Sequence, residues 1–237
     1  MSASTAGRIG IWGASGSGKS SYVKQLLKGR ARMVVFDPLA EYAPLCNVTV
    51  RSLDSVRLAM RKDWRGFRIA YVPVAGQEPR SLSALAKLLI AAQEPYRQTG
   101  AGGQITMVVE EMNLSFPVHG GAEKAPGFAD VCSRGRHFGI EVYGLSQRIA
   151  EVATRFRGNC TETVVMRQQG PRDVKAASDA SGASAAQIGR LQNLDYIHSA
   201  GGVLTPGKIT FNKRAANVNS PPAANVNSAP LKKRRKR

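Results

Sequence analysis

The chain has 237 residues, of which 43% are hydrophobic, and a formal net charge of +18 at pH 7. This excess of positive charge argues against an acidic, disordered protein and favours a polyanionic partner, either nucleic acid or an anionic membrane surface. No apolar run approaches the roughly 18 residues that a membrane span needs, and three widely spaced cysteines predict neither a disulfide framework nor a zinc site.

Short apolar runs alternate with helical patterns along most of the chain. Strands are predicted at residues 8–12, 32–36, 47–50, 68–74, 105–109, 141–145 and 162–166. Helices are predicted at residues 18–28, 55–61, 81–92, 173–180 and 183–191. Because strands that alternate with helices form βαβ crossovers, the pattern predicts an α/β fold, with a mostly parallel sheet and helices on both faces.

The composition changes near residue 213. Residues 213–237 contain eight Lys and Arg, no acid and no aromatic residue, and they include a tandem octapeptide rich in Ala, Asn and Pro. Such a segment cannot bury enough apolar surface to offset its ordering entropy. We therefore predict one folded domain over residues 1–212 and a flexible basic tail over residues 213–237. The tail could tether DNA, anchor to anionic lipid headgroups or serve as a nuclear-localisation-like signal.

The sharpest motif follows the first predicted strand and opens the first predicted helix. It matches G-x-x-x-x-G-K-S/T and consists of Gly13, Ala14, Ser15, Gly16, Ser17, Gly18, Lys19 and Ser20. Glycines allow successive backbone N–H groups to curl around a phosphate, and the following helix N-terminus adds partial positive charge. Lys19 is predicted to reach the β- and γ-phosphates and Ser20 to ligate Mg²⁺, so the motif predicts ATP and Mg²⁺ as cofactors.

Polar residues follow three of the other predicted strands, at the edge of the sheet where open α/β folds bind ligands. Asp37 follows residues 32–36 and is a candidate for nucleotide binding. Glu110 and Glu111 follow residues 105–109, and we assign Glu110 to Mg²⁺ and Glu111 to the attacking water. Gln147, after residues 141–145, is a candidate contact for the γ-phosphate or for that water.

These segments together resemble the HerA/FtsK superfamily of P-loop motor ATPases. The family's "DPxxEY", "GRxFG" and "SQR" signatures have counterparts at residues 37–42, 135–139 and 146–148, although the family often has Asp-Glu where this chain has Glu110 and Glu111. The resemblance implies a RecA-like fold and a homo-oligomeric ring, often a hexamer, with ATP at each subunit interface. It also implies an arginine supplied in trans, for which Arg136 and Arg134 are the leading candidates; Arg155, Arg157 and Arg167 are alternatives.

In its short, single P-loop domain, the chain resembles the genome-packaging ATPases of membrane-containing double jelly-roll viruses and phages. The expected function is therefore an ATP-hydrolysing motor that packages double-stranded DNA, acting in the host cytoplasm or at the packaging vertex of the virion. Capsid vertex proteins or the viral membrane are further expected partners, reached through the basic tail. A cellular or plasmid motor for repair, partition or conjugation is the main alternative, followed by a small-molecule kinase and a non-catalytic, nucleotide-gated binding module.

Overall fold

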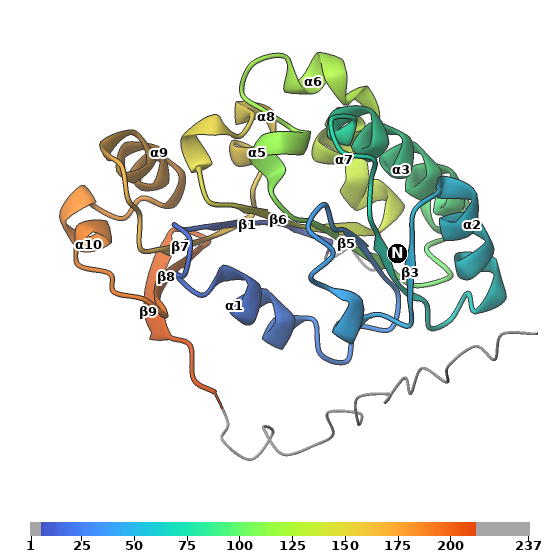
Figure 1. Cartoon of the computed structure of the whole chain (residues 1–237), viewed down its shortest axis with the longest axis horizontal. Helices are drawn as coiled ribbons and strands as arrows, with labels where there is room; N and C mark the ends of the chain where they lie inside the picture. The colour runs from blue at the N-terminus through green and yellow to red at the C-terminus, as the bar shows by residue number, and fades with distance from the viewer. Residues whose placement is uncertain (1–5, 212–237) are drawn as a thin grey trace, which may run out of the picture.

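A nine-stranded sheet forms the centre of the computed structural model, which describes residues 6–211. Its order is β3-β4-β2-β5-β6-β1-β7-β8-β9 (Figure 1). The strands are β1 (Arg8–Trp12), β2 (Met33–Phe36), β3 (Val48–Val50), β4 (Arg68–Tyr71), β5 (Ile105–Val109), β6 (Ile140–Ser146), β7 (Glu162–Met166), β8 (Asp195–Ala200) and β9 (Val203–Lys208). Strands β1 to β7 are parallel, and β8 and β9 add an antiparallel edge. The predicted tail, residues 213–237, lies outside the described residues.

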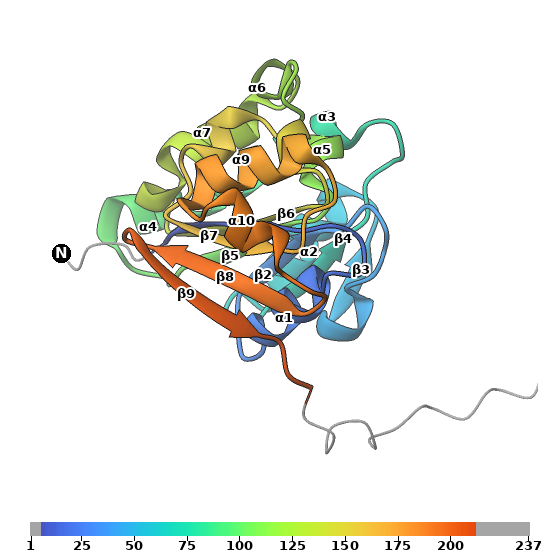
Figure 2. The same ribbon diagram turned by 90° about the vertical axis from the view of Figure 1, so that its left-hand side faces the viewer.

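Helices cover both faces of the sheet (Figures 1 and 2). One face is covered by α1 (Lys19–Leu26) and by the segment that contains η1 (Ala43–Leu45). The other face carries α2 (Leu53–Lys62), α3 (Glu78–Ala92), α5 (Met112–Ser115), α7 (Pro126–Arg134), α8 (Thr154–Arg157) and α9 (Pro171–Ser181). The remaining short helices are α4 (Glu94–Thr99), α6 (Gly121–Lys124), η2 (Gly135–Phe138), η3 (Ile149–Glu151) and α10 (Ala185–Gly189). No helix within residues 6–211 is long and apolar enough to cross a bilayer.

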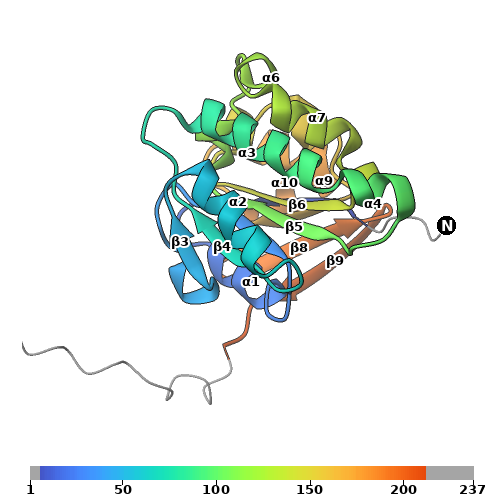
Figure 3. The same cartoon turned by 90° about the vertical axis from the view of Figure 1, so that its right-hand side faces the viewer.

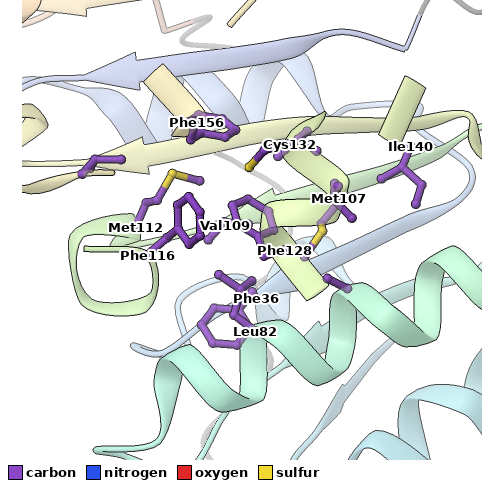
Figure 4. Packing of buried hydrophobic residues seen from close by; sticks show 14 of the residues in the cluster. Phe36, Leu82, Met107, Val109, Met112, Phe116, Phe128, Cys132, Ile140 and Phe156 are labelled. Atoms are coloured by element: carbon purple, nitrogen blue, oxygen red, sulfur yellow. The ribbon is translucent and has the colours of Figure 1, made fainter. Parts of the chain in front are cut away.

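The larger core lies under α3 and α7 (Figure 4). Every residue of β5 is buried, as its unbroken apolar sequence predicts for a central strand covered on both sides. Phe128 of α7 meets Phe116 edge to face, with ring centroids 5.0 Å apart, and Phe156 from the other side at 5.9 Å. This aromatic cluster packs the helical layer onto the half of the sheet that carries the functional residues.

The seven predicted strands all form, with ends shifted by a few residues. The predicted strand 68–74 ends at Tyr71, where the chain turns toward α3. The sequence analysis did not predict α7 or the β8–β9 hairpin. Pro126 and Gly127 obscure the start of α7, yet Gly127 is required there, because a Cβ would lie 2.3 Å from the Ser83 carbonyl oxygen. In β9, Pro206 and Gly207 weaken the strand pattern, which is tolerated at an edge position.

Candidate active site

The glycine-rich loop between β1 and α1 forms a cradle of backbone groups. Gly16 and Gly18 have φ of 72° and 107°, which is left-handed backbone that glycine adopts readily. At Gly18 a Cβ would also lie 2.7 Å from Ile209 Cδ1. Helix α1 begins at Lys19, so its N-terminal N–H groups point back into the loop, as an anion-binding site requires.

Two distant segments hold the glycine-rich loop in place. The backbone N–H of Ala14 donates to the Arg167 carbonyl at 2.8 Å, and the Arg167 guanidinium donates to the Ser15 carbonyl at 3.0 Å. On the other side, the Leu194 N–H donates to the Ser17 carbonyl at 2.9 Å. Arg167, one of the alternatives for an arginine acting in trans, therefore braces the loop of its own chain.

Lys19 lies within the loop that it is predicted to serve. Its Nζ donates to the carbonyls of Gly13 at 2.6 Å and Ala14 at 3.2 Å, and the side chain is buried. Burial lowers the pKa of Lys19, while the charges of Glu111 and Glu110 oppose that effect. The two carboxylates thus favour the ammonium form that phosphate binding needs.

Glu110 sits at the carboxyl end of β5, only 6% exposed. Its Oε1 accepts hydrogen bonds from Ser20 Oγ at 3.2 Å and from the Tyr42 hydroxyl at 2.5 Å. Burial raises the pKa of Glu110, the charge of Glu111 adds to the rise, and the hydrogen bonds from Tyr42 and Ser20 counter it. A buried carboxylate beside a serine hydroxyl is a set of hard oxygen donors that fits Mg²⁺.

Glu111 points in a different direction from Glu110. Its backbone is left-handed, with φ 44° and ψ 54°, an uncommon conformation for a residue other than glycine. Its Oε1 accepts a 2.7 Å hydrogen bond from Gln147 Nε2, which comes from the end of β6. The two adjacent acids therefore face different partners, as the prediction of separate roles requires.

These side chains surround a cavity of about 340 Å³ at the carboxyl ends of the strands. The cavity is lined by Ser15, Gly16, Gly18, Lys19, Ser20, Ser21, Leu39, Glu41, Glu110, Glu111, Gln147 and Leu194. Lys19, Ser20, Glu110, Glu111 and Gln147 are thus brought together as predicted. The sequence analysis missed four lining residues: Ser21, Leu39, Glu41 and Leu194. For Leu194 no signal was available, because nothing in a single sequence relates it to a loop so far from it along the chain.

Asp37 is not part of this lining, which corrects its predicted contact with nucleotide. The side chain is fully buried, and its two oxygens accept the backbone N–H groups of Glu41 at 3.0 Å and Tyr42 at 2.9 Å. Asp37 therefore fixes the turn after β2 and places Tyr42 against Glu110. Its role at the site is indirect.

Arg134 and Arg136 lie at the opposite edge of the sheet, in the segment that enters β6. Arg134 is exposed and pairs with Asp130 at 3.1 Å, and Arg136 is exposed in η2. Neither can reach the cavity of its own chain, because the length of β6 lies between them and Gln147.

Sequence comparison matches the chain to no protein-family model and to no curated protein. Its fold resembles that of the genome packaging NTPase B204 from Sulfolobus turreted icosahedral virus 2 in complex with AMPPCP, with a TM-score of 0.69 at 14% identity over 87% of this chain and 98% of that chain. VirB4 of Thermoanaerobacter pseudethanolicus gives 0.62 at 13% identity over 87% and 90% of the two chains. The pCW3 conjugation coupling protein TcpA gives 0.56 at 16% identity over 88% and 61%.

At these identities the likeness establishes the fold. The chain has the α/β architecture of RecA-like P-loop ATPases, and it resembles the HerA/FtsK type as the motifs predict.

Proposed function

We propose that this chain is an ATP-hydrolysing motor that translocates double-stranded DNA and packages a viral genome. The observation that carries the proposal is the pair of carboxylates at the end of β5. Glu110 faces Ser20, and Glu111 faces the cavity with Gln147 at 2.7 Å. A second carboxylate beside the phosphate site suits hydrolysis by water better than transfer to a bound small molecule, which disfavours a kinase.

Each side chain has a role in this scheme. The loop amides and Lys19 bind the β- and γ-phosphates of ATP, and Glu111 accepts a proton from the attacking water while Gln147 orients its carboxylate. Ser20 and Glu110 are the residues that would hold Mg²⁺, which supplies positive charge to the phosphates when bound.

A ring of identical subunits, often a hexamer in the resembling family, completes the proposal. Its support is the position of Arg136 and Arg134, which are exposed on the edge away from the cavity of their own chain. An arginine donated from a neighbouring subunit stabilises charge on the transferring phosphoryl group and is worth about 10³–10⁵ in rate. Arg155 and Arg157 enter β7 at the same edge and remain alternatives.

The packaging role rests on the similarity to the viral NTPase B204, and the host cytoplasm or the packaging vertex is the corresponding location. Capsid vertex proteins or a viral membrane are partners that we assign to the basic tail. The likeness to VirB4 and TcpA favours a second candidate, a motor that transfers DNA in conjugation.

Phosphate release from ATP by the purified full-length chain, with no phosphoryl acceptor present, tests the proposal. We expect turnover that requires Mg²⁺ and increases with double-stranded DNA. Glu111→Gln is expected to bind ATP but hydrolyse it at least about 10²-fold more slowly, whereas Glu110→Gln loses Mg²⁺-dependent binding. If Glu111→Gln hydrolyses ATP normally and Glu110→Gln binds ATP without hydrolysing it, the two acids have the opposite roles. If the wild type releases no phosphate in the absence of a phosphoryl acceptor, it is not a hydrolase.

A further inference from the structure

Charge divides between the two edges of the parallel sheet. At the carboxyl edge the cavity is lined by three acids, Glu41, Glu110 and Glu111, against one base, Lys19. The amino edge, defined as the segments that enter β4, β2, β5, β6 and β7, is predominantly basic. Its basic residues are Lys28, Arg30, Arg32, Arg61, Lys62, Arg65, Arg68, Arg97, Arg134, Arg136, Arg155 and Arg157, against which Asp63, Glu94, Asp130, Glu141 and Glu162 are the acids of the same segments and strand starts. Figure 3 shows this edge on the side marked by α4.

Much of this charge is free to meet a partner. Apart from the candidates for the arginine in trans, Lys28, Arg61, Lys62 and Arg65 are exposed and form no salt bridge within residues 6–211. The structure therefore keeps several solvated cations on one edge. Solvated cations gathered on one surface create a positive potential that attracts a polyanion.

Two hollows on the amino edge bring basic groups together. One, of about 310 Å³ between the ends of α2 and α3, is lined in part by Arg57, Arg61 and Trp64. The other, of about 280 Å³, is lined in part by Lys28, Asn47 and Arg68. The first hollow is lined mainly by apolar side chains, and its Arg57 pairs with Asp54. The second places two cations on a concave surface, which is a suitable shape for a phosphate group.

We propose that the amino edge binds the sugar–phosphate backbone of double-stranded DNA. This edge is opposite to the carboxyl edge, where the proposed ATP site lies. The identification of the polyanion as DNA rests on the proposed function. The presence of the basic edge is an observation that does not depend on that function. From β4 to β5, the part of the edge without candidates for the arginine in trans, the edge crosses two strand spacings, or about 10 Å at 4.8 Å each, which is enough to meet more than one phosphate. Arginine predominates over lysine there, and its planar fork matches phosphate oxygens in pairs.

The test uses the full-length chain and two triple variants of equal charge change. The amino-edge variant is Arg61→Gln/Lys62→Gln/Arg65→Gln, which avoids the candidates for the arginine in trans. The control is Arg80→Gln/Arg172→Gln/Arg190→Gln, three exposed residues at the carboxyl edge that form no salt bridge within the described chain. Binding to a duplex is measured across a salt series, together with thermal unfolding, ATP hydrolysis without DNA, and binding to phosphatidylserine vesicles.

We expect the amino-edge variant to bind DNA at least about tenfold more weakly at low salt and to lose about 2–3 from the slope of log affinity against log salt, at about 0.9 per phosphate contact. The control is expected to keep the wild-type slope, and both variants the wild-type basal hydrolysis. Equal losses in the two variants, or a wild-type slope in the amino-edge variant, would overturn the proposal. The proposal would also be overturned if the amino-edge variant lost binding to phosphatidylserine vesicles but still bound DNA as the wild type does. If the slopes behave as expected but the wild type does not hydrolyse ATP, only the proposed motor function fails.

Discussion

The amide of Gln147 donates a 2.7 Å hydrogen bond to Glu111 and so ties the end of β6 to the end of β5 at the rim of the cavity. Glu111 adopts left-handed backbone, which costs an L-residue about 1–2 kcal/mol. Within residues 6–211, this amide is the only side-chain donor to the Glu111 carboxylate. The orientation of the proposed base therefore depends on its neighbouring strand.

Gln147→Ala is expected to lower kcat for ATP hydrolysis by about tenfold, with KM changed less than about twofold. The carboxylate of Glu111 stays in place but loses its orientation, so the chemical step suffers more than binding. Steady-state kinetics measure both terms. Gln168→Ala, at the end of β7, is the matched control and should behave as wild type; a tenfold rise in KM at unchanged kcat would show that Gln147 binds substrate instead.

Lys19→Ala is expected to abolish ATP hydrolysis while the chain stays folded. Among the residues that the structure describes, the ammonium donates only to the carbonyl oxygens of Gly13 and Ala14, so its loss removes a proposed phosphate ligand without opening the core. Phosphate release and thermal unfolding are measured in parallel with Lys28→Ala, an exposed lysine beyond the end of α1. Wild-type turnover by Lys19→Ala would exclude the glycine-rich loop as the site of hydrolysis.

Tyr42→Phe is expected to move the acid limb of the pH profile of kcat/KM to higher pH. The Tyr42 hydroxyl donates to the ionised form of Glu110 and thereby lowers a pKa that burial raises. Without that bond the pKa of Glu110 rises further, so the carboxylate takes up its proton, and loses affinity for a cation, at a less acidic pH. If the pH profiles of the wild type and of Tyr42→Phe coincide below pH 7, the Tyr42 hydroxyl does not control the pKa of Glu110.

Gly18→Ala is expected to lower the free energy of unfolding by more than Gly29→Ala does. Both glycines have positive φ, but a Cβ at Gly18 would lie 2.7 Å from Ile209 and 2.9 Å from Leu194, whereas a Cβ at Gly29 meets nothing within 4 Å. The shared backbone strain costs about 1–2 kcal/mol, and overpacking adds about 1–3 kcal/mol at Gly18 alone. Urea unfolding measures the free energy of unfolding of the two variants. An equal decrease in both would mean that Ile209 and Leu194 move aside at no cost to accommodate the new Cβ.

The features that were predicted correctly from the sequence are those that a short stretch of residues determines by itself. A strand followed by a glycine-rich loop and a helix is a local unit, and acids directly after a buried strand must lie at its carboxyl end. The alternation of strands and helices likewise predicted the parallel sheet. Asp37 shows the limit of this reasoning, since position at a strand end says nothing about whether the carboxylate faces a ligand or its own turn.

Contacts between distant segments account for what the sequence did not predict. The β8–β9 hairpin contains Pro206 and Gly207, so its strand signal is weak, and it is held by pairing to β7. Helix α7 is stabilised by burial of Phe128 against Phe116 and Phe156 more than by local preference. The contact of Tyr42 with Glu110 depends on how two loops meet above the sheet.

The packing of Gly18 against Leu194 and Ile209 also bears on biosynthesis. Residues 13–20 of the phosphate-binding loop are synthesised well before Leu194 and Ile209, the two residues that pack against Gly18. Contacts of such large sequence separation form slowly, and their formation waits until both partners are available. A nascent chain that does not yet include residues 194 and 209 therefore lacks one of the two segments that hold the loop, and we expect it to bind nucleotide more weakly until they emerge.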